Sequence, residues 1–214
     1  FNNSSINRLK NSNKDKNINN NEKSKKILDL KEEINSIGNC KIKNNNKQMV
    51  LGDGNIDSSL MIIGSAPGEK DSLSGKTFFG NDGILLEKML TAINIEKHNI
   101  YSTYVVNYRP HEDRKPTTEE IKRYKPFLQK HISIINPKII ILMGSTAMEA
   151  LTGLNNKISV ERGKWKEIII KNISYKVIIT FDPSYLLRFP ENKKFSWEDL
   201  KKIKQKIIDL NLNT

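Results

Sequence analysis

The sequence is poor in cysteine and histidine, two side chains that commonly hold metals. Cys40 is the only cysteine among 214 residues, and the three histidines show no metal-ligand spacing. One cysteine cannot form an intrachain disulfide, and by itself it holds neither an iron–sulfur cluster nor a structural zinc ion. We therefore expect no metal, no cofactor and a reducing, cytoplasmic setting.

Long apolar stretches are also missing. No run approaches the roughly 18–20 apolar residues that a membrane span requires, so we expect no membrane partner. Hydrophobic residues make up 36% of the chain, which is enough to bury one core of ordinary size. Residues 1–26 contain mostly Asn, Lys and Ser, and we expect a disordered tail there, followed by one domain over 27–214.

Acidic residues are outnumbered by basic ones. The chain has 36 Lys and Arg against 24 Asp and Glu, for a net charge of +12. This excess favours an anionic partner, most simply nucleic acid. An alternative stays open, because joint enrichment in Lys, Asn and Ile is also typical of AT-rich coding DNA and raises basicity without any function.

From residue 60 onward, apolar runs of strand length alternate with helical periodicity. The pattern predicts an α/β fold, namely a three-layer α/β/α sandwich around a mostly parallel four-stranded sheet, with its loops gathered at one edge. A hairpin between 168–170 and 175–177 can extend the last strand. The expected core strands cover 60–63, 99–106, 138–143 and 177–180, and expected helices include 26–36 and 82–94.

Short signals mark the ends of several elements. Thr117 and Glu120 form a capping box for a helix that runs to about residue 136. Ser196 is the expected cap of the closing helix. The Gly-Asp-Gly sequence at 52–54 predicts a turn.

Two loops follow predicted strands at the edge where open α/β sheets bind ligands. Residues 64–68 read Gly-Ser-Ala-Pro-Gly, and such small residues let the backbone approach a ligand, although a plain turn is the alternative. Phe78, in a loop bounded by glycines, can stack on a base or anchor the loop in the core. Residues 181–188, Phe-Asp-Pro-Ser-Tyr-Leu-Leu-Arg, follow the last core strand.

Taken together, these segments resemble the uracil-DNA glycosylase superfamily over about residues 38–208. The similarity is to family-four and related bacterial enzymes, in which the first loop reads Gly-Glu-Ala-Pro-Gly and the last reads His-Pro-Ser-x-Leu-Leu-Arg. It implies a monomeric DNA glycosylase that flips uracil out of DNA and hydrolyses its N-glycosidic bond, the first step of base excision repair. The partner it implies is DNA containing uracil.

The resemblance also assigns roles to individual residues. Ser65, Tyr104 and Asp182 take the catalytic positions, although the family has Glu, Asn and His there. An ionised Asp182 would repel charge on the leaving uracil, so it helps only if burial protonates it or if it activates water. A degenerate relative that only binds DNA is the alternative. The resemblance assigns base and sugar contacts to Gly64, Ala66, Pro67, Gly68, Asp71 and Phe78, and DNA contacts to Pro183, Ser184, Leu186, Leu187 and Arg188.

Family-four enzymes also hold an iron–sulfur cluster on four cysteines. Here Cys40 matches the first cysteine, the second is lost around Lys43, and Tyr108 and Tyr124 replace the other two. The resemblance therefore implies a cluster-free branch, with aromatic packing at the former cluster site.

Overall fold

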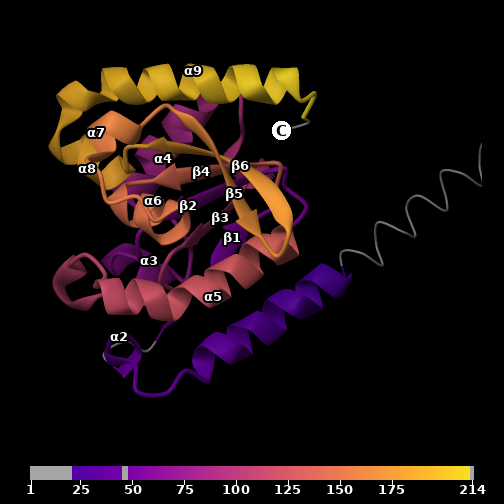
Figure 1. The fold of residues 1–214 in the computed structure, drawn as a ribbon. Coiled ribbons are helices and arrows are strands. Elements are labelled where there is room, and N and C mark those ends of the chain that lie inside the picture. Colours follow the sequence, from indigo (N-terminus) through magenta and orange to yellow (C-terminus); the bar gives the residue numbers. More distant parts are fainter. Residues whose placement is uncertain (1–20, 45–47, 213–214) are drawn as a thin grey trace, which may run out of the picture.

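A computed structural model describes residues 21–44 and 48–212 of the protein (Figure 1). One six-stranded sheet runs through the molecule in the order β1-β3-β2-β4-β6-β5. The four central strands are parallel to one another, and both edge strands are antiparallel to their neighbours. The strands are β1 (Gly52–Gly54), β2 (Leu60–Gly64), β3 (Tyr101–Tyr104), β4 (Ile139–Met143), β5 (Trp165–Ile170) and β6 (Ile173–Thr180).

The sheet confirms the predicted parallel core and corrects its size from four strands to six. The segment expected to be a turn at 52–54 is the edge strand β1, in which Asp53 pairs with Ser102 of β3. Its two glycines lack the β propensity that marks a strand, so only the pairing with β3 makes it one. The expected hairpin of β5 and β6 is present, and Lys171 and Asn172 connect it with positive φ angles of 48° and 65°. Two such residues make the tight turn that suits a right-twisted hairpin.

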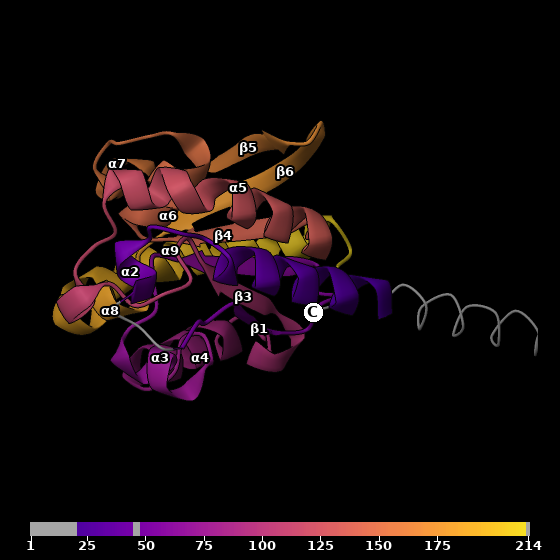
Figure 2. The same ribbon diagram turned by 90° about the horizontal axis from the view of Figure 1, so that it is seen from below.

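Helices cover both faces of the sheet (Figures 1 and 2). Alternate residues of β2 point to opposite faces, and they join two separate buried clusters. Met61 and Ile63 pack with α5, α6 and the helix over 21–35, whereas Leu60 and Ile62 pack with α4 and α9. The helices are α2 (Lys41–Asn44), α3 (Glu69–Ser74), α4 (Asn81–Thr91), α5 (Thr118–Ile135), α6 (Ser145–Thr152), α7 (Ile158–Glu161), α8 (Pro183–Arg188) and α9 (Lys193–Asp209).

The ends of these helices test the expected caps. Thr117 caps α5 as predicted, since its side chain accepts a hydrogen bond from the Glu120 N–H and the Glu120 carboxylate accepts one from the Thr117 N–H. Ser196 does not cap the closing helix. A 3-10 turn at Pro190–Asn192 leads directly into α9, so the helix begins at Lys193 and Ser196 is buried inside it.

The N-terminal helix begins before the predicted residue 26. Residues 21–35 are helical, so the expectation of disorder is wrong for 21–26, and the rest of the predicted tail lies outside the described residues. Leu30 and Ile34 bury this helix against the core that it shares with α5, and Lys130 of α5 forms an ion pair with Glu33. That packing supplies the stability that local composition did not predict. Among the described residues, no helix is both long and apolar enough to cross a membrane.

Candidate active site

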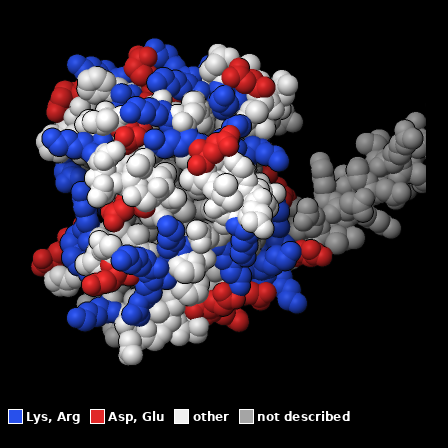
Figure 3. All heavy atoms as spheres, in the orientation of Figure 1, with Lys and Arg blue, Asp and Glu red and all other residues white. Residues whose placement is uncertain are grey.

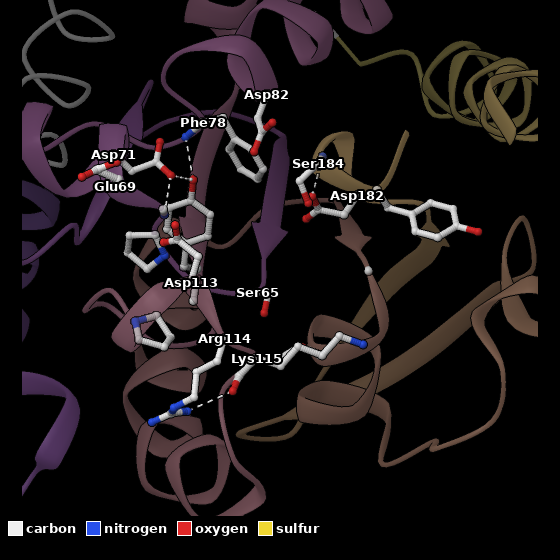
Figure 4. A pocket seen from close by; sticks show the side chains of 18 of the residues that line it. Ser65, Glu69, Asp71, Phe78, Asp82, Asp113, Arg114, Lys115, Asp182 and Ser184 are labelled. Carbon is white, nitrogen blue, oxygen red and sulfur yellow. Dashed lines mark hydrogen bonds between the residues drawn. The ribbon is translucent and has the colours of Figure 1, made fainter. Parts of the chain in front are cut away.

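A cavity of about 620 Å³ opens at the carboxyl ends of the parallel strands (Figure 4). The segments that follow β2, β4 and β6 meet there, and β3 contributes its last residue, Tyr104. This is the edge at which parallel α/β sheets bind ligands. Ten of the predicted site residues line the cavity, namely Ser65, Ala66, Pro67, Gly68, Asp71, Phe78, Tyr104, Asp182, Ser184 and Arg188.

Asp71 holds the first loop together. Its carboxylate accepts hydrogen bonds from the Gly68 N–H (2.8 Å), the Phe79 N–H (2.6 Å) and the Tyr104 hydroxyl (3.0 Å). Burial raises the pKa of Asp71 above its ordinary value, although these hydrogen bonds oppose the shift. Asp71 therefore joins α3, the Phe78 loop and β3 into one rigid wall of the cavity.

Phe78 and Tyr104 form an aromatic pair within this wall, where both line the cavity and are largely buried. The Phe78 N–H donates to the Tyr104 hydroxyl at 2.7 Å, and the two ring centroids lie 5.1 Å apart. Phe78 has a φ of 47°, an unusual value for a bulky residue, and Lys97 donates to its carbonyl at 2.9 Å. The Tyr104 hydroxyl is thus bonded to two protein partners, which makes Tyr104 a positioning residue in this conformation.

Gly64 lies under this aromatic pair and does not line the cavity. A Cβ atom at Gly64 would come within 2.8 Å of the Phe78 and Tyr104 rings, so only glycine leaves room for the two rings to pack here. The predicted contact between Gly64 and a ligand stays a prediction. The residue supports the site from behind.

Asp182 immediately precedes α8 and faces the cavity next to Ser184 (Figure 4). Its carboxylate accepts a hydrogen bond from the Ser184 N–H at 2.9 Å and thereby caps the helix. Burial raises the pKa of Asp182, and neighbouring Asp71 adds to the shift, whereas Ser184 and Arg188 oppose it. The capping role gives a structural reason for an acid at this position, and the raised pKa favours its protonated form.

The sequence did not single out Asp82, a third acid that lines the cavity. It lies in the first turn of α4, where an acidic residue is ordinarily explained by the helix dipole. Burial, and then the charges of Asp182 and Asp71, raise the pKa of Asp82 to about 6, while Arg188 and Lys70 oppose the shift. Sequence reasoning also missed Gly144, Ser145 and Thr146, which follow β4 at the same edge of the sheet.

The segment predicted to contact DNA divides into buried and exposed residues. Leu187 and Arg188 are exposed, and Arg188 also lines the cavity. Pro183 and Leu186 are buried, and Leu186, only 1% exposed, packs in the core with Phe181 and Leu200. The helical turn of α8 points these two side chains inward, and their DNA contacts stay a prediction.

The positions of the cations near the cavity bear more directly on nucleic-acid binding than the total charge does. Lys and Arg are spread over the face in Figure 3 rather than gathered in one stripe. The cations that line the cavity are Lys70, Arg114, Lys115 and Arg188. Arg114 also forms an ion pair with Glu120 at 2.7 Å. Basic groups at a cavity mouth can contact phosphates and so position a nucleic acid without reading its sequence.

The residues that match the family's cluster ligands do lie close together. The Cys40 sulfur is 3.5 Å from the Tyr124 hydroxyl, and Tyr108 donates to the Asn35 side chain at 2.7 Å. One thiol among phenols does not fit an iron–sulfur cluster. Within the part of the chain that the structure describes, no group of three His, Cys, Asp or Glu residues could hold a metal ion.

Comparison with known proteins identifies the family to which this fold and cavity belong. The sequence profile of the uracil DNA glycosylase superfamily matches residues 51–203. The chain therefore belongs to the uracil DNA glycosylase superfamily, as its motifs predicted.

Several relatives carry the name type-4 uracil-DNA glycosylase. The protein from Thermotoga maritima is 35% identical over 167 residues, which cover 77% of this chain and 86% of the relative. The protein from Sulfurisphaera tokodaii is 32% identical over 184 residues, with 84% of each chain covered. The protein from Archaeoglobus fulgidus is 31% identical over 179 residues, which cover 82% of this chain and 90% of the relative.

Proposed function

We propose that the protein is a uracil-DNA glycosylase that hydrolyses the bond between uracil and deoxyribose in DNA. One observation carries the proposal, namely that the loops after β2 and β6 meet at one cavity containing Phe78 and Asp182. An aromatic ring and an acid in one concave site suit a base that has been flipped out of the helix. The relatives named type-4 uracil-DNA glycosylase support the same substrate.

In this proposal, uracil enters the cavity and stacks on Phe78. The backbone of residues 65–68 lies against the sugar, while Leu187 and Arg188 contact the DNA beside the vacated position. Breaking the N-glycosidic bond places positive charge on the sugar and negative charge on the base. A protonated Asp182 donates a hydrogen bond to a uracil oxygen as that negative charge develops. The raised pKa of Asp182 supports this role, because it extends the protonated form to higher pH.

Asp182 has a second possible role, as the base that takes a proton from water. Ser65, which stands where the family has Glu, can hold a water molecule but is a poor acceptor for its proton. The two roles predict opposite effects of pH. If Asp182 acts as a donor, uracil release falls as rising pH ionises it, and if it acts as a base, release rises over the same range.

The decisive experiment measures free uracil released from single-stranded and double-stranded DNA. We expect Asp182→Asn to retain part of the wild-type rate, because an amide can both cap α8 and donate to uracil. Asp182→Ala removes both interactions, so release should fall by about a hundredfold or more. Asp29→Asn, which removes an exposed acid from the N-terminal helix, serves as the control.

A DNA-binding module without catalysis is the second candidate. The three motif replacements Ser65, Tyr104 and Asp182 favour it, because each removes a group that the family uses to read the uracil or to assist the reaction. This candidate predicts equal affinity for DNA with and without uracil, and no free uracil from the wild-type protein. Release of uracil by the wild type but not by Asp182→Ala would exclude it.

A further inference from the structure

A row of aromatic rings leads from the cavity to the protein surface along α8. Phe181 and Tyr185 both line the cavity, and their ring centroids lie 4.9 Å apart at an interplanar angle of 23°. The ring of Tyr185 lies 4.9 Å from that of Phe189, which directly follows the helix. Phe181 is buried, Tyr185 is half-buried and Phe189 is 44% exposed. The row therefore begins at the proposed active site and ends in solvent.

A second exposed ring is connected to this row by Arg162. The α8 helix leads through the 3-10 turn into α9 (Figure 1), where Phe195 is 40% exposed. The central carbon of the Arg162 guanidinium lies 5.9 Å from the Phe181 ring centre and 5.3 Å from that of Phe195. Asp199 accepts hydrogen bonds from this guanidinium and so fixes it between α9 and the row. Two aromatic side chains, Phe189 and Phe195, thus reach solvent beside the site.

The two exposed rings do not serve the hydrophobic core. Leu186 and Leu200, from the same two helices, belong to a buried cluster, whereas neither Phe189 nor Phe195 belongs to one. Single exposed apolar residues are common on soluble proteins and need no explanation. Exposed rings that continue a stacked row out of a ligand cavity are different, because they extend the surface that a bound ligand can contact.

Exposed cations lie among these rings. Residues 185–197 contain three basic side chains and one acidic side chain, Glu191. The three exposed basic residues are Arg188, Lys193 and Lys194. The Lys194 Nζ lies 5.1 Å from the centre of the Phe195 ring. Rings that stack on bases, placed among cations that contact phosphates, are typical of surfaces that bind single-stranded nucleic acid. This charge and ring chemistry favours an unpaired DNA strand as the occupant.

Duplex DNA gains less from such rings than a single strand does. In a duplex, the bases next to uracil are paired and stacked, so a base reaches an external ring only after both interactions are broken. Stacking on one aromatic ring at most offsets the free energy that this unpairing costs. In a single strand the neighbouring base is already unpaired, and stacking on the ring then adds directly to affinity.

We propose that the surface formed by Tyr185, Phe189 and Phe195 binds the unpaired bases next to uracil, and that single-stranded DNA is the preferred substrate. The inference rests on the proposed glycosylase function and names the strand state of its substrate. Uracil occupies the cavity, and the adjacent nucleotides follow the row of rings outward along α8. Arg188 and Lys194 contact the phosphates of these nucleotides.

Binding is tested by fluorescence anisotropy on a single-stranded oligonucleotide without uracil and on a duplex of the same sequence. Phe189→Ala should weaken single-strand binding by about tenfold, which lies within the usual range for one stacked base, and duplex binding by less than about twofold. Phe189→Trp should bind the single strand as tightly as wild type, because it restores a stacking face. Phe189→Leu keeps apolar bulk without a ring and should bind as weakly as Phe189→Ala. Ile169→Ala, which removes an exposed apolar side chain from β5, is the control.

Uracil release gives a second measurement. Any glycosylase avoids an unpairing cost on a single strand, so faster release from single-stranded DNA is expected but does not by itself implicate the rings. The informative quantity is the ratio of release from single-stranded DNA to release from duplex DNA at low substrate concentration. Phe189→Ala should lower this ratio by about the same factor as it lowers single-strand affinity, and Ile169→Ala should leave it unchanged.

The outcomes separate this inference from the proposed function. If the wild type releases no uracil but its single-strand binding depends on Phe189, the surface is supported and the proposed function is overturned. Equal single-strand affinity in wild type and Phe189→Ala overturns the inference, whether or not uracil is released. Equal weakening of single-strand and duplex binding also overturns it, because unpaired bases are then not what the ring contacts. If Phe189→Ala instead changes the oligomeric state in sedimentation and leaves DNA affinity unchanged, the rings join two copies of this chain and the inference is wrong.

Discussion

The hydroxyl of Tyr104 is the point at which the aromatic wall of the cavity can be tested with one atom. Tyr104→Phe keeps the ring and removes the oxygen that joins the Phe78 N–H to the Asp71 carboxylate. A buried N–H left without a partner costs about 1–3 kcal/mol, and a hydrogen bond to a charged group contributes about 1.5–3 kcal/mol. Asp71 keeps its bonds to Gly68 and Phe79, which limits the second loss. We expect a net destabilisation of about 2–4 kcal/mol.

Urea unfolding at pH 7, followed by circular dichroism, measures this loss directly. Tyr175→Phe is a matched control, because the Tyr175 hydroxyl makes a longer bond of 3.3 Å to the Asn136 side chain. It should cost less than about 1 kcal/mol. If the two variants lose the same stability, the bridging role of Tyr104 is refuted. The Phe78 loop should also loosen in Tyr104→Phe, so weaker substrate binding is expected together with the loss of stability.

Three further predictions concern charge. The pKa of Asp82 is raised from 3.8 to about 6, so the stability it contributes is present at low pH and is lost as pH rises through that interval. The full shift corresponds to about 3 kcal/mol of unfolding free energy, and solvent screening at this partly exposed group reduces that value. Thermal melts should therefore show Asp82→Asn more stable than wild type by about 1 kcal/mol at pH 7.5 and equal to it at pH 3.5. Asp199 is fully buried and accepts hydrogen bonds from Arg162 and Thr180, so Asp199→Ala should lower the free energy of urea unfolding by about 3–5 kcal/mol. Breaking an exposed pair, such as Lys201 with Glu198, should lower it by less than about 1 kcal/mol. DNA affinity should fall steeply as salt is added. In gel-shift titrations, the affinity of Arg188→Ala should depend less on salt than that of Lys204→Ala, which is a control on α9. Equal slopes for the two variants would show that Arg188 does not contact DNA.

The sequence alone predicted the elements that are marked by residues close together in the chain. The apolar run of β4 predicts a strand buried on both faces, because no polar side chain interrupts it. The capping box of Thr117 and Glu120 placed the start of α5, because its two hydrogen bonds span only three residues. The motifs at 64–68 and 181–188 predicted both the family and the edge of the sheet that carries the site, because chain order in an α/β fold places such loops together.

Tertiary packing decided what depends on residues distant in sequence. The segment at 52–54 is a strand because β3 lies beside it, and Leu186 is buried because α8 turns that side chain toward α9. Tyr104 is bonded to Asp71, 33 residues earlier, so its hydroxyl serves the wall of the cavity. Asp82 gained its raised pKa only when folding brought Asp71 and Asp182 near it. Burial and charge depend on neighbours in space, and chain order reveals those neighbours only after the chain has folded.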